Sequence, residues 1–105
     1  MSENRELNVV IDGTINVAST TNVVRLADTI YLAITKDKVT PTIKTIGGDA
    51  ISQMVKALTR TRARLLSEGV DIYWYSFWQT VTGERDGKKL SQIITKVEIK
   101  ENNND

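Results

Sequence analysis

The chain has 105 residues, of which 40% are hydrophobic and 26% are charged. This size allows one compact core but not two ordinary domains, so we expect a single domain over residues 1–105 with an ordered core of about residues 7–100. Cysteine and histidine are both absent, which excludes disulfides and zinc–thiolate sites and removes the commonest general base. We therefore expect no enzyme activity, no metal and no cofactor.

The longest apolar run, residues 72–75, is far shorter than a membrane span, and the N-terminus does not resemble a signal segment. The sequence thus predicts a cytoplasmic protein. Its net charge is only +1, but residues 36–70 hold seven cations and three anions, a local charge of +4. This distribution fits a localised phosphate-binding face, and it equally fits a solvated helix surface.

The first half of the chain predicts two strands and a helix. Residues 7–12 alternate apolar and polar side chains and should form the first strand, which Gly13 ends. Several helix caps follow in residues 19–22, and apolar residues then recur at spacings of four, three and four up to Ile34, so a helix is expected. Residues 42–46 are short and β-branched, which suits a second strand.

The second half predicts a longer helix and a hairpin. Gly47 and Gly48 break the chain, Asp49 can cap a helix that runs to about Glu68, and Gly69 can stop it. Residues 70–82 and 90–100 have strand patterns on either side of a turn-rich segment. The order predicts an α+β fold, a βαβαββ two-layer sandwich whose four-stranded mixed sheet carries both helices on one face.

Two groups of cations could bind phosphates. Lys56, Arg60 and Arg64 lie four residues apart on the second helix and form a line about 12 Å long. Arg85, Lys88 and Lys89 lie in the hairpin turn, whose length suggests an arm. A solvated helix face and an ordinary charged turn would show the same residues, so the two interpretations stay open.

The aromatic residues indicate a second contact surface. Five of the six lie in residues 73–78, and strand alternation sends Trp74 and Trp78 to one face and the other three to the opposite face. One set should pack under the helices, and the other should meet a second subunit, a nucleic-acid base or solvent. Arg62 falls within the apolar sector of its helix, which suggests an interface position or a stem that packs while its guanidinium reaches water.

The element order and the run IGGDAISQMV, residues 46–55, together with the long hairpin, resemble the Alba family of chromatin and RNA-binding proteins. The similarity is best over residues 43–100. In that family a Gly, a variable residue and an Ala-Ile-Ser segment open the second helix, as residues 48–52 do here. The stage V sporulation protein S group, which has a related fold, resembles the same stretch and also residues 69–71.

The resemblance implies a DNA- or RNA-binding homodimer, joined through the second helix and the final strands, with paired hairpin arms. The nucleic-acid-binding residues would be Lys44, Lys56, Arg60, Arg64, Arg85, Lys88 and Lys89, and the dimer interface would contain Leu58, Arg62, Leu66, Tyr75 and Phe77. Family members usually carry lysines after the first strand, whereas residues 13–22 contain no cation. The alternative is therefore an interaction or regulatory domain that has kept this fold without nucleic-acid binding.

Overall fold

The computed structural model describes residues 8–9, 13–83 and 87–100, and the expected polar tails and the residue Arg85 lie outside the described residues. The elements are β1 (Asn8–Val9), β2 (Thr14–Val17), α1 (Val23–Thr35), β3 (Thr42–Thr45), α2 (Gly48–Leu66), β4 (Asp71–Thr82) and β5 (Lys89–Lys100). The predicted α+β class and the βαβαββ order are confirmed. The short strand β1 is an addition at the edge of the sheet.

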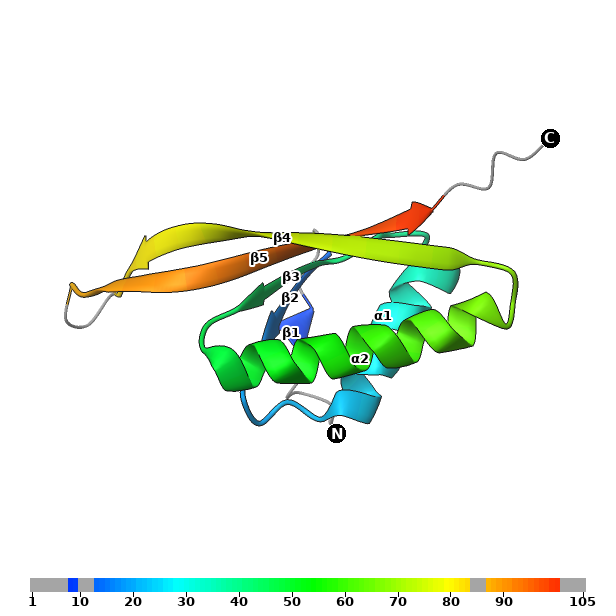
Figure 1. The fold of residues 1–105 in the computed structure, drawn as a ribbon, viewed down its shortest axis with the longest axis horizontal. Coiled ribbons are helices and arrows are strands. Elements are labelled where there is room, and N and C mark those ends of the chain that lie inside the picture. The colour runs from blue at the N-terminus through cyan, green and yellow to red at the C-terminus, as the bar shows by residue number, and fades with distance from the viewer. Residues whose placement is uncertain (1–7, 10–12, 84–86, 101–105) are drawn as a thin grey trace.

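The sheet has the strand order β1-β2-β3-β5-β4. β2 and β3 are parallel, and the other neighbours are antiparallel. The connections through α1 and α2 both advance across the sheet in the same direction, and right-handed crossovers in one direction lie on one face. Both helices accordingly lie under the same side of the sheet (Figure 1). Within the described part of the chain, the opposite side carries no helix.

The first strand differs from the prediction. Residues 14–17, which were expected to follow the strand, pair in parallel with β3 and bury Ile15 and Val17. Only residues 8–9 of the predicted strand belong to a described strand, and they pair with β2. Gly13 precedes β2 instead of ending a strand, and its φ of 86° is a conformation that suits glycine. Stretches with alternating apolar and polar side chains lie on both sides of this glycine. The sequence pattern alone did not show which of them pairs with β3.

The helix caps explain where the helices begin and end. The Asn22 side chain accepts a hydrogen bond from the Arg25 backbone N–H at 3.0 Å, as an N-cap does. The N-cap of α2 is Gly47, so the prediction of Asp49 as the cap is wrong. Asp49 lies in the first turn of α2, where its negative charge interacts favourably with the positive end of the helix dipole. Gly69, with φ 85°, follows the end of α2 as expected.

The core lies between the helices and the covered face of the sheet. The sheet contributes Ile15, Ile43, Ile72 and Val97, and the helices contribute Leu26, Ile30, Leu58 and Leu65, all almost without exposure. Thr61 on α2 is also buried, and its hydroxyl donates a hydrogen bond to the Ala27 carbonyl of α1 at 3.1 Å. Apolar burial, together with this bond between the helices, holds the two layers together.

The hairpin reaches beyond the layered part of the molecule. β4 and β5 pair over twelve residues each, from Asp71–Lys100 to Thr82–Lys89. β3 pairs with β5 only between residues 93 and 96. The part of the hairpin past this point, residues 79–83 and 87–92, is named the hairpin arm, and it projects past the start of α2 (Figure 1).

Replacing Leu58 with Ala should lower the free energy of unfolding by about 2–5 kcal/mol, because this fully buried side chain would leave a cavity between α2 and the sheet. The matched control is Leu32→Ala on α1, where the side chain is half exposed, and a change of less than about 1 kcal/mol is expected there. Urea titrations followed by circular dichroism give both values. Equal effects at the two positions would contradict this packing.

Candidate functional site

The helix-free side of the sheet is named the open face. Tyr73, Tyr75 and Phe77 alternate along β4 with side chains that point to the helices, such as buried Ile72 and half-buried Trp74. The three rings therefore point away from the helices. They are exposed to 50%, 50% and 44%, respectively. The predicted division of the aromatic residues between two faces is thus present, with Trp74 packed against the core.

Neighbouring strands continue these positions into rows across the open face, because side chains directly opposite each other in a sheet share a face. Tyr75 is opposite Lys96, and Lys96 is opposite Thr42. In the next row, Phe77 is opposite Ile94, and Ile94 is opposite Lys44. Ile94 points away from the helices but is only 5% exposed, because it lies between the Phe77 ring and the aliphatic part of the Lys44 side chain. The rows thus join aromatic rings to cations.

A shallow hollow of about 360 Å³ lies at the carboxyl ends of the parallel strands β2 and β3. Its lining residues are Asn16, Val17, Ala18, Ser19, Lys44, Ile46 and Gln92. Lys44 thus lies beside the loop that follows β2, which contains no cation of its own. The Gln92 amide donates a hydrogen bond to Gln79 on β4 at 2.9 Å, which ties the hollow to the base of the hairpin arm.

Lys88 and Lys89 lie at the end of the hairpin arm, and both are exposed. The Gly83 N–H donates to the Lys88 carbonyl at 2.7 Å, and the Gly87 N–H donates to the Gly83 carbonyl at 3.1 Å, so backbone bonds close the described part of the turn. The predicted arm therefore has two described cations at its end, far from the helix layer (Figure 1).

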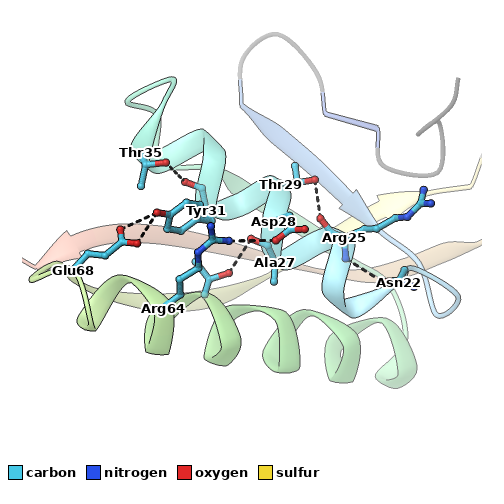
Figure 2. Close-up of polar contacts among 10 residues, drawn as sticks. Asn22, Arg25, Ala27, Asp28, Thr29, Tyr31, Thr35, Arg64 and Glu68 are labelled. Atoms are coloured by element: carbon cyan, nitrogen blue, oxygen red, sulfur yellow. Dashed lines mark hydrogen bonds and ion pairs between the residues drawn. The ribbon is translucent and has the colours of Figure 1, made fainter. Parts of the chain in front are cut away.

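The cationic line on α2 is partly engaged within the molecule. The Arg64 guanidinium lies 3.4 Å from the Asp28 carboxylate and 3.6 Å from the centre of the Tyr31 ring, as Figure 2 shows. The Tyr31 hydroxyl in turn donates to the Glu68 carboxylate at 2.7 Å, a hydrogen bond that raises the pKa of Tyr31. These contacts link α2 to α1 at the exposed side of the helix layer. Lys56 and Arg60 remain exposed on the same helix.

The outer edge of the sheet is a separate surface. β4 is the last strand of the described sheet, and α2 runs beside it. Arg62 on α2 binds Asp71 on β4 through two hydrogen bonds of 2.8 and 3.3 Å, which shows that this side of the helix faces the edge. Val55 and Leu66 share this side by helical spacing, and both are exposed. We name the outer backbone edge of β4, together with the side chains of Val55, Arg62 and Leu66, the edge surface.

The structure separates the residues that the sequence grouped as a dimer interface. Arg62 and Leu66 lie on the edge surface, whereas Tyr75 and Phe77 lie on the open face. Leu58 is fully buried in the core and has no exposed surface with which to contact a partner. Its prediction as an interface residue is therefore wrong. The helical wheel placed it beside Leu66, but the sheet covers its sector of the helix.

Sequence reasoning did not select Lys96, Gln92 or Asp71. The alternation in β5 could have placed Lys96 on the same face as the aromatic rings once the hairpin register was known. The pairing of Arg62 with Asp71 joins two segments through a register that the sequence pattern did not specify. Within the described residues, no cluster of acidic side chains could hold a metal ion, and neither helix is long and apolar enough to cross a membrane.

Comparison with known proteins first defines the class of the fold. The structure is similar to that of Alba from Thermoplasma volcanium, with a TM-score of 0.55 and 17% sequence identity over 78% of this chain and 96% of the other. At that identity the likeness shows an Alba-like fold. The sequence profile of the stage V sporulation protein S (SpoVS) family matches residues 13–100, and the chain belongs to this family. No curated protein matches the sequence.

The Arg62–Asp71 pair should make stability depend on pH. The hydrogen bonds from Arg62 lower the pKa of Asp71, so the pair stabilises the folded state above about pH 3.9, the ordinary pKa of an aspartate, and this contribution disappears as the pH falls through the lowered value. Asp71→Asn should therefore melt at a lower temperature than the wild type at pH 7, and the difference should shrink below about pH 4.

Melting curves between about pH 2.5 and pH 7 measure this effect. Arg62→Gln should reproduce it, and the double variant should be no less stable than either single variant because both changes remove one interaction. A difference that stays constant across the pH range would show that the ion pair is not its cause.

Proposed function

We propose that this chain is a sequence-tolerant nucleic-acid-binding protein that acts as a homodimer, without enzyme activity. The observation that carries the proposal is the series of cations along β3 and the β4–β5 hairpin. Lys44 in the hollow, Lys96 in the centre of the open face and Lys88 and Lys89 on the hairpin arm all lie on β3 or on the β4–β5 hairpin. A nucleic-acid backbone can cross them in one path.

The chemistry of these residues favours phosphate contacts over base recognition. Lysine ammonium groups are point charges that neutralise phosphates, and they lack the planar fork with which arginine recognises guanine. A binding mode that depends on phosphates is tolerant of sequence and sensitive to salt. Arg85 adds a cation to the same turn of the sequence. Lys56 and Arg60 on α2 would make secondary phosphate contacts, and Arg64 contributes less because it already binds Asp28.

Lys44 could replace the lysines that Alba proteins usually carry in the loop after the first strand. The loop after β2 has no cation, but Lys44 lines the hollow together with Ala18 and Ser19 of that loop. A phosphate at this position would meet a lysine from the neighbouring strand instead of one from the loop. The sheet therefore compensates in part for the absence of loop lysines.

The edge surface supports the homodimer. β4 is a twelve-residue edge strand rich in aromatic residues, and such edges attract another chain unless they are protected. Exposed Val55 and Leu66 lie beside it. A second copy related by a two-fold axis would cover both apolar side chains and bring two hairpin arms into one particle. Two arms allow two simultaneous contacts with one nucleic acid, which increases the effective affinity.

A second candidate function is an interaction domain without nucleic-acid binding. The observation that favours it is the net charge of +1, which is low for a dedicated nucleic-acid domain. Under this second hypothesis the fold and the edge surface are the same, but Lys44, Lys88 and Lys89 have no functional role.

The variant Lys88→Gln with Lys89→Gln should weaken binding to duplex DNA and reduce its dependence on salt. Removing one phosphate contact makes the slope of log K against log salt concentration shallower by about 0.9. Fluorescence anisotropy at several salt concentrations measures the slope. The control is Lys36→Gln with Lys38→Gln, which removes the same charge at the turn after α1, at the opposite end of the molecule from the arm (Figure 1).

The control variant should keep the wild-type slope. An equal decrease in both variants would mean that net charge alone governs binding, and no binding by the wild type at low salt would favour the interaction domain.

Leu66→Glu should convert the dimer into monomers, because the change places a charge in an apolar contact between copies. The dissociation constant of the dimer should rise by about tenfold or more in sedimentation equilibrium. Leu32→Glu, on a half-exposed position of α1 away from the edge surface, is the control and should leave the dimer intact. A wild-type protein that is monomeric at all concentrations would contradict the dimer, and an intact Leu66→Glu dimer would exclude this surface.

A further inference from the structure

We propose that the open face of β4 is a stacking platform for the bases of single-stranded nucleic acid. The platform consists of Tyr73, Tyr75 and Phe77. This inference rests on the proposed function and extends it, since the cations described above explain only contacts with phosphates. It assigns a ligand class, unpaired strands, to a face of the sheet that the helices leave uncovered.

The spacing of the rings fits a series of bases. Alternate residues of a strand lie about 6.7 Å apart, so the three side chains form a ladder along one line. Each ring is about half exposed, which leaves a face or an edge accessible to a ligand. Bases of any identity can stack on aromatic side chains, because every base has a π-face. The ladder therefore matches sequence-tolerant binding.

The charges on the open face favour a polyanion at one end of the ladder. Lys96 is opposite Tyr75, and Lys44 lies two strands from Phe77 in the same row, on the far side of Ile94. Glu98 is opposite Tyr73 and makes that end less favourable for phosphates. Stacking should therefore be strongest at Tyr75 and Phe77, because each of their rows contains a lysine.

A second copy of the chain fits the open face less well. Two open faces in contact would bury Lys44, Lys96 and Glu98, and burying charges without matched partners is costly. The edge surface offers apolar side chains to a partner without this cost. A duplex fits the ladder poorly as well, because its bases are already stacked on each other, whereas an unpaired strand presents free bases to aromatic side chains.

The experiment compares two fluorescent single-stranded DNA oligonucleotides of equal length and charge, one of mixed sequence and one made of abasic sites. Wild-type protein should bind the first more tightly, because only the first can stack. In Tyr75→Val and in Phe77→Val, affinity for the mixed sequence should fall by about 5- to 150-fold. Affinity for the abasic strand should stay unchanged. Valine keeps the β-propensity of the strand, and circular dichroism checks the fold of each variant.

The matched control is Trp78→Val, which removes a 73% exposed aromatic ring from the helix-facing side of the same strand. It should leave the affinity for both oligonucleotides unchanged. Because the wild-type comparison uses no variant, it tests stacking even if a substitution destabilises β4.

The outcomes separate this inference from the proposed function. Equal wild-type affinity for the two oligonucleotides overturns stacking and leaves phosphate binding in place. Tighter binding of the mixed sequence that survives in Tyr75→Val and Phe77→Val overturns the assignment to this ladder. No binding of either oligonucleotide at low salt overturns the platform, and the titration with duplex DNA decides separately whether the proposed function stands.

Discussion

The arrangement of the whole molecule depends on the two crossover connections that place both helices on one face of the sheet. The parallel pairing of β2 with β3 requires the first crossover, and the second passes over β5 to reach β4. Because both advance in one direction with the same hand, a single layer of helices forms. One face of the sheet is buried under it, and the other face must carry side chains that are stable in contact with water or with a partner.

This one-sided layering separates three surfaces with different chemistry. The open face combines aromatic rings with lysines. The edge surface combines the outermost strand of the described sheet with apolar helix residues, and the outer side of the helices holds the Arg64, Asp28 and Tyr31 contacts. The hairpin extends the first of these surfaces beyond the helices (Figure 1). Under the proposed function, nucleic acid and a second subunit would use different sides of the same strand pair without competing.

The sequence predicted the element order well because each helix has a clear apolar period and most breaks contain glycine, proline or helix-capping residues. It misplaced the first strand, since residues 7–12 and 14–17 both alternate and only tertiary pairing selects the second stretch to pair with β3. It assigned Leu58 to an interface because periodicity does not show which side of a broad apolar sector is covered. The roles of Lys96 and Asp71 depend on which residues they are paired with across strands and helices, and the pattern along one segment does not show those partners.

If the helix-free side of the sheet is the nucleic-acid-binding side, a bound strand should perturb the sheet more than α2 and should spare α1. Backbone amide chemical shifts of the isotope-labelled full chain, recorded during titration with a mixed-sequence single-stranded oligonucleotide, test this most directly. The largest changes are expected in residues 42–44, 73–77 and 88–96, with α1 unaffected. Changes confined to the exposed sides of α1 and α2, with the sheet unchanged, would contradict it.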